Sequence, residues 1–147
     1  PLGLPFNVTQ YATLLKMIAQ VTDKEPGTIT YSIKDAHVYV NQLNGIKKQL
    51  ERLEKYNSLN KLSDNYLEML KQSLLGQQKL FDKDSDEYDE LDSNIKIIDM
   101  IFNPTKPELV LNPDIDDFFL FDNSKDLKDI KIKNYKHMGK IKFPITQ

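Results

Sequence analysis

Residues 7–22, NVTQYATLLKMIAQVT, carry the pattern of an amphipathic helix. Their apolar side chains fall three or four positions apart, as one buried helical face requires: Val8, Tyr11, Leu14, Leu15, Ile18 and Val21. Asn7 precedes this stripe and belongs to the residue types that cap helix N-termini. The stretch therefore predicts a helix that is capped by Asn7 and ends at Val21 or Thr22.

The segment after this helix has strand character. Pro26-Gly27 is a turn signal, and apolar and polar residues then alternate over 29–34, ITYSIK, which predicts a strand. Residues 37–40, HVYV, are a candidate continuation of it. Asn41 then has the position of a cap for a second helix, whose apolar side chains are Leu43, Ile46 and Leu50.

The zone 51–106 differs from the rest of the chain in charge. It holds 12 acidic and 8 basic residues. Two helical stripes of apolar residues run through it: Leu67, Leu70, Leu74 and Leu75, then Leu91, Ile95, Ile98 and Ile101. Ser63 and Ser85 are candidate caps. We expect one or two added helices here, continuous with the helix that starts at Asn41. The acidic run 82–92 lacks the spacing of a calcium loop and fits a solvated loop and helix start.

The last zone starts at Pro107 and predicts short strands. Residues 109–111, LVL, form a buried strand candidate that Asn112-Pro113 ends. Ile130 and Ile132 alternate with lysines, as in a strand with one exposed face. The aromatic cluster at 118–121, FFLF, is expected in the core.

Composition excludes several classes of function. The 147 residues make one ordinary domain with net charge −2, and no apolar run reaches the roughly 18 residues of a membrane helix. With no cysteine, the chain has no disulfide, thiolate metal site or cysteine nucleophile. Lysines are concentrated near the end of the chain, but the chain as a whole is acidic, so this pattern is weak evidence for nucleic-acid binding. No DNA partner is therefore expected. The chain start has no secretory leader, which predicts a cytoplasmic location.

Two clusters of residues carry potential chemistry. Asp35, His37 and Tyr39 share one face of an extended strand, as a satisfied polar network or as part of a ligand pocket. Residues 3–7, GLPFN, form either a bare helix-capping turn or a turn that presents the Asn7 amide, a donor and an acceptor, to a ligand. His137 lies among lysines and is expected to be exposed.

The motif LGLPFN at 2–7, followed by the helix pattern, resembles the thymidylate synthase family just beyond its catalytic cysteine. DAHVYVN at 35–41, LNP at 111–113 and KFPITQ at 142–147 match the family in the same order. The resemblance covers about 1–50 and 107–147. It implies an α+β fold with a mixed sheet and long helices, in which 51–106 is an acidic helical insertion and 107–147 is the C-terminal core with a closing tail.

The resemblance also implies a reaction and roles for residues. The family methylates deoxyuridylate (dUMP) to thymidylate with 5,10-methylenetetrahydrofolate, as a homodimer and without a metal. Asn7 would pair with the uracil ring, and His37 and Tyr39 would bind the deoxyribose hydroxyl. Gly3, Phe6 and Thr146 would contact the folate. An amide at Asn7 suits uracil better than cytosine, which argues against a cytidylate hydroxymethylase.

The chain departs from the family pattern at Pro1, Lys34, Gln42 and Gln147, where the family has phenylalanine, glycine, usually histidine and an apolar residue. The family's cysteine nucleophile and phosphate-binding arginines precede the segment that matches Pro1. We therefore expect that the nucleophile lies upstream and that the isolated chain is inactive and poorly soluble. The alternative is a non-catalytic interaction module that uses the acidic zone as its partner surface.

Overall fold

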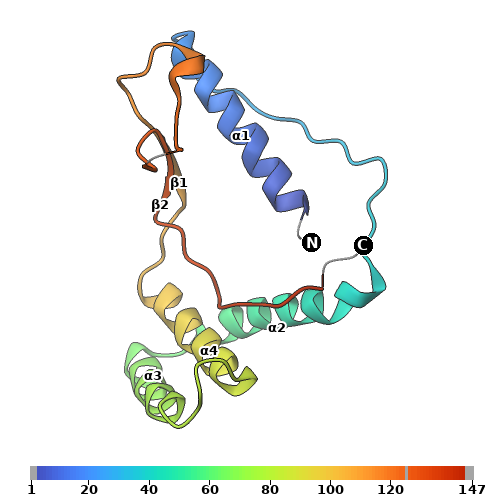
Figure 1. Cartoon of the computed structure of the whole chain (residues 1–147). Coiled ribbons are helices and arrows are strands. Elements are labelled where there is room, and N and C mark those ends of the chain that lie inside the picture. The colour runs from blue at the N-terminus through green and yellow to red at the C-terminus, as the bar shows by residue number, and fades with distance from the viewer. Residues whose placement is uncertain (1–2, 125, 145–147) are drawn as a thin grey trace. The chain divides into compact units, whose positions relative to one another are not determined.

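The computed structural model describes residues 3–124 and 126–144 and has an α+β fold (Figure 1). Its elements are α1 (Gly3–Val21), the 3-10 helix η1 (Val40–Gln42), α2 (Leu43–Leu59), α3 (Asp64–Gln78), α4 (Asp86–Phe102), β1 (Glu108–Leu111), the 3-10 helix η2 (Phe118–Leu120) and β2 (Ile130–Lys133). They form two compact units. Unit 1 is Pro1–Val38 with Pro107–Tyr135, and unit 2 is Tyr39–Lys106 with Lys136–Gln147.

Unit 1 is built from α1 and an antiparallel pair of strands. β1 pairs with β2 in a register that sets Leu109 opposite Ile132, so both strands predicted in the last zone are confirmed. The side-chain amide of Gln20, on α1, donates hydrogen bonds of 2.8 Å to the carbonyls of Asn112 and Ile115. These bonds fix the C-terminal end of α1 against the segment that follows β1.

The described part of unit 2 contains three α-helices, with α4 packed against both α2 and α3. Its buried apolar side chains are Leu67 of α3 and Ile95, Ile97 and Ile98 of α4. The predicted stripes therefore locate the core of this unit, because apolar residues at helical spacing share one face. The second predicted helix does continue beyond residue 50, since α2 ends at Leu59. Within the described ranges, no helix is long and apolar enough to cross a membrane.

The predicted starts of two helices were wrong. α1 begins at Gly3 rather than at Asn7, which lies inside the helix. Pro5 does not prevent this earlier start, because a first-turn residue has no intrahelical acceptor for its N–H. α2 begins at Leu43, after a 3-10 turn that contains Asn41, and its N-cap Gln42 makes no side-chain capping bond.

Two further predictions were wrong. Residues 29–34 and 37–39 are irregular rather than strands, because a strand needs a neighbour to pair with. In the described part of the chain, the sheet consists of β1 and β2 alone, so the mixed sheet stays a prediction. The aromatic cluster is not core either: the Phe119 side chain is 89% exposed, and it stacks edge-on against Phe118 at a centroid distance of 5.5 Å.

Candidate functional site

Three of the predicted ligand-binding residues lie in the first two turns of α1. Gly3 begins the helix, and a Cβ added there would meet no atom within 4 Å among the described residues beyond its own helical turn. Phe6 is largely exposed, although it is a large aromatic side chain. Asn7 is exposed, and its side-chain amide makes no hydrogen bond among residues 3–124 and 126–144. Both hydrogen-bonding groups of this amide are therefore available to a ligand.

His37 and Tyr39 lie in the irregular segment that leads from unit 1 to unit 2. The Nδ1 atom of His37 lies 3.3 Å from a carboxylate oxygen of Asp35, in a pair whose side chains are both exposed. Tyr39 precedes η1 with extended backbone angles, and its carbonyl accepts a hydrogen bond of 2.9 Å from the Gln42 N–H. Asp35 and His37 therefore lie close together. The strand face that was to align them with Tyr39 is absent, since 37–39 is irregular.

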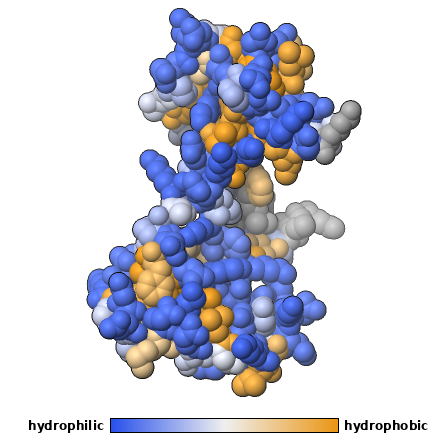
Figure 2. Space-filling view, turned by 90° about the vertical axis from the view of Figure 1, so that its left-hand side faces the viewer, coloured by the Kyte–Doolittle hydropathy of each residue, from blue (hydrophilic) through white to orange (hydrophobic). Residues whose placement is uncertain are grey.

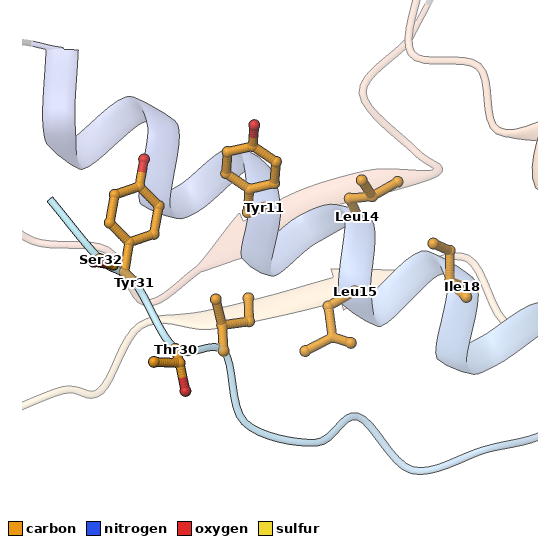
Figure 3. Close-up of a pocket in the computed structure, with 8 residues that line it drawn as sticks. Tyr11, Leu14, Leu15, Ile18, Thr30, Tyr31 and Ser32 are labelled. Atoms are coloured by element: carbon orange, nitrogen blue, oxygen red, sulfur yellow. The ribbon is translucent and has the colours of Figure 1, made fainter. Parts of the chain in front are cut away.

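A cavity of about 530 Å³ lies between α1 and the extended segment after it (Figure 3). It is lined by Tyr11, Leu14, Leu15, Ile18, Ile29, Thr30, Tyr31 and Ser32. The rings of Tyr11 and Tyr31 lie 6.3 Å apart with an interplanar angle of 59°, and Figure 3 shows both phenol oxygens on the same side. The walls are mainly apolar with a few hydroxyl groups, which suits burial of an apolar surface that has a polar edge.

A second cavity, of about 440 Å³, follows another side of α1 and is lined by Phe6, Thr9, Gln10, Tyr11, Thr13, Leu14 and Met17. Phe6, predicted to contact folate, is therefore part of an open apolar surface. Neither cavity is lined by Asn7 or His37. Tyr31 was not predicted as a site residue. The alternation of apolar and polar residues over 29–34 predicted a strand there and gave no indication of a cavity wall.

The described side chains can bind and orient a ligand, but they include no cysteine thiol that could act as a nucleophile. The chain has no cysteine. Among residues 3–124 and 126–144, no group of three or more histidine, aspartate or glutamate side chains could hold a metal ion. His137 is exposed as predicted, and its Nδ1 accepts a hydrogen bond of 3.2 Å from the Gly139 N–H. Thr146 lies outside the described residues.

Comparison with known proteins identifies the family behind these features. The sequence profile of the family described as thymidylate synthase matches residues 1–147. The chain belongs to the thymidylate synthase family. The family inferred from the motifs around Asn7 and His37 is thus confirmed. The match includes the helical zone 51–106, which the resemblance in the sequence did not cover, as well as both of its flanks.

Relatives named thymidylate synthase occur in bacteria and fungi. The Clostridium beijerinckii protein is 30% identical over 145 residues, which is 99% of this chain and 36% of the relative. The Candida albicans protein is 46% identical over 54 residues, 37% of this chain and 17% of the relative. The Saccharomyces cerevisiae protein is 47% identical over 51 residues, 35% of this chain and 17% of the relative. The chain thus spans about a third or less of each of these relatives, and no solved structure gives a significant match.

Proposed function

We propose that this chain is the nucleoside-binding part, and a section of the folate-binding part, of a thymidylate synthase. The observation that carries the proposal is the family match over residues 1–147. Asn7, His37 and Tyr39 stand in the motifs LGLPFN and DAHVYVN, which resemble the family's binding motifs. The complete enzyme would transfer a one-carbon unit from 5,10-methylenetetrahydrofolate to dUMP and release thymidylate and dihydrofolate. The family's fold around these residues, with its mixed sheet, is part of the proposal.

Asn7 is proposed to recognise the uracil ring. Its amide donates to a ring carbonyl and accepts from the ring N–H, a pattern that uracil offers and cytosine reverses at these two positions. The Asn7 amide is exposed and makes no hydrogen bond to the residues that the structure describes, which supports this role because the ligand then displaces water from it.

His37 and Tyr39 are proposed to hold the deoxyribose hydroxyl, which both donates and accepts a hydrogen bond. The carboxylate of Asp35, 3.3 Å from the Nδ1 atom of His37, would orient the imidazole so that Nε2 faces the sugar. The half-exposed phenol of Tyr39 supplies the second contact.

Folate is proposed to contact Gly3, Phe6 and Thr146. The exposed ring of Phe6 and the open Cβ position of Gly3 support a flat aromatic ligand at the start of α1. Closure of the C-terminal tail with Thr146 would exclude water and hold the two reactants together. The cysteine that attacks the pyrimidine would come from polypeptide outside these 147 residues, so the chain alone would be inactive.

The role of Asn7 can be tested in an enzyme that also carries the cysteine-bearing part. Asn7→Ala should lower kcat/KM for dUMP by about tenfold or more, because the site loses two hydrogen bonds to the ring. Asn7→Asp should shift the preference from dUMP toward deoxycytidylate. Asn57→Asp, at an exposed position of α2, is the matched control. Unchanged dUMP kinetics in both Asn7 variants would refute the proposed role.

The complete enzyme is further proposed to act as a homodimer in the cytoplasm. The competing hypothesis, a non-catalytic interaction module, is favoured by one observation, the net acidic charge of the zone 51–106, which would be its partner surface. Calorimetry with dUMP on the complete protein separates the two hypotheses. Binding that Asn7→Ala weakens supports the enzyme, whereas absence of binding together with a tight protein partner supports the module.

A further inference from the structure

Arg52, the only arginine of the chain, is a buried cation whose hydrogen-bonding capacity is only partly used. It comes from α2 and is 8% exposed. Its Nη1 donates to the Gly139 carbonyl at 3.0 Å, and its Nη2 donates to the Lys140 carbonyl at 3.1 Å. The other N–H donors of the guanidinium have no acceptor within residues 3–124 and 126–144, and no carboxylate there forms an ion pair with it. An anion beside Arg52 would therefore offset the cost of burying its charge.

Arg52 lines a cavity of about 130 Å³ that belongs to unit 2. Lys48 lines the same cavity one helical turn before Arg52 on α2, so the two side chains share a face of the helix. Lys140 lines it from the segment 140–142. Neither lysine forms an ion pair in the part of the chain that the structure describes. The cavity thus brings together three cations that lack a carboxylate partner among these residues.

Three carboxylates near the start of α4 also line the cavity: Asp86, Asp89 and Glu90. The ammonium group of Lys142 lies 3.4 Å from an Asp86 oxygen and 3.9 Å from an Asp89 oxygen, so it offsets part of their charge. Glu90 forms no ion pair with any described cation. The charges without a partner are therefore three positive and one negative, which favours an anion in the cavity, while Glu90 opposes it.

We propose that this cavity binds a small oxyanion, the phosphate or carboxylate group of a ligand. Arg52 is its main hydrogen-bond donor, and Lys48 and Lys140 are the flanking cations. A guanidinium suits both kinds of oxyanion, because its N–H groups can reach two oxygens at once. None of the three residues belongs to the motifs LGLPFN or DAHVYVN, and none lines the two cavities along α1. The site is therefore independent of the proposed thymidylate synthase activity.

Calorimetry on the full chain tests the site with inorganic phosphate and with acetate, at constant ionic strength. Lys48→Gln should weaken binding of the preferred anion about fivefold, because it removes an attractive charge. Glu90→Gln should strengthen it by a similar factor, since it removes the opposing charge. Lys55→Gln and Glu54→Gln make the same two charge changes at exposed positions of α2 outside the cavity, and they should leave binding unchanged.

Arg52→Lys keeps the charge but removes the forked donor group, so it should weaken binding about tenfold. Lys48 and Glu90 are exposed, and their variants keep the proposal testable if Arg52→Lys fails to fold. Tighter binding of phosphate than of acetate assigns the site to a phosphate group, and the reverse order assigns it to a carboxylate. Absence of heat with both anions would overturn the proposal. Equal effects of the cavity variants and their controls would overturn it as well, because the anion would then respond only to the net charge of the chain.

Discussion

At the scale of single residues, Asp129 organises the turn region of unit 1. Its carboxylate accepts a 2.9 Å hydrogen bond from the Asn112 side chain and a 3.0 Å bond from the Asp122 N–H, and the residue is only 4% exposed. Its backbone carbonyl accepts from the Asn112 N–H at 2.8 Å. The side-chain bond from Asn112, and then the bond from Asp122, lower the pKa of Asp129 below its ordinary value of 3.8, although burial opposes the shift.

This lowered pKa predicts how the stability of unit 1 depends on acid. A carboxylate with a depressed pKa stabilises the folded state above its ordinary pKa of 3.8, and the contribution is lost as the pH falls through the lower folded value. Asp129→Asn should therefore reduce stability at pH 7 and flatten the loss of stability below about pH 4. The measurement is the urea midpoint of unfolding between pH 7 and pH 2.

Asp116→Asn, at an exposed carboxylate of the same unit, is the control. The pKa of Asp122 is also lowered, by hydrogen bonds from Ser124, so Asp129→Asn should remove only part of the acid dependence. An acid profile of Asp129→Asn that runs parallel to the wild-type profile would contradict the assignment.

At the scale of elements, both α3 and α4 have a serine as their N-cap, but only the serine of α4 makes a side-chain capping bond. The hydroxyl of Ser85, the N-cap of α4, accepts a 3.1 Å hydrogen bond from the Tyr88 N–H. Ser63, the N-cap of α3, makes no such bond with its side chain. Three acidic residues in the first turn of α4 add a favourable interaction with the helix dipole: Asp86, Glu87 and Asp89.

The two serines form a matched pair of variants. Ser85→Ala should lower the free energy of unfolding of unit 2 by about 1 kcal/mol, because one N–H of the first turn of α4 loses its acceptor. Ser63→Ala should cost less than half of that, since no capping bond is broken. Urea unfolding followed by the helical circular dichroism signal measures both changes. Equal losses in the two variants would show that the capping bond of Ser85 does not act as described.

At the scale of the whole molecule, unit 1 leaves much of its apolar surface uncovered. The exposed side chains of α1 and of the segment after it are Leu4, Phe6, Val8, Tyr11, Leu14, Ile18, Ile29, Tyr31 and Ile33. Figure 2 shows apolar patches on this unit, at the top of the view. Such contiguous patches usually mark contact surfaces, because water is excluded from them on association.

We therefore predict that the chain alone self-associates as its concentration rises, and that it binds a hydrophobic dye. Ile18→Lys should reduce both effects, since a charge in the middle of the α1 face is costly to bury. Leu80→Lys, at an exposed leucine just after α3 in unit 2, should change them little. Light scattering over a concentration series is the measurement. A monomer that persists at high concentration and binds no dye would contradict the prediction.

The sequence by itself determined the family, the α+β class, the three α-helices of unit 2 and both strands of the antiparallel pair. These features depend on local signals. The spacing of apolar residues in α3 and α4 places them on one face of each helix. The turn residues Asn112-Pro113 directly follow β1 and mark its end. The motifs around Asn7 and His37 sufficed for the family because they combine unusual residues in a fixed order.

The tertiary structure alone decided the features that depend on contact with a part of the chain distant in sequence. The alternation over 29–34 predicts a strand, but no described strand pairs with it, so its backbone stays irregular. The cluster at 118–121 is apolar, but Phe119 is exposed to solvent. Burial of an apolar side chain depends on whether another segment packs against it, which the local sequence does not show. Arg52 gave no signal of burial, since its acceptors at Gly139 and Lys140 lie nearly ninety residues away, and only folding brings them within hydrogen-bond distance.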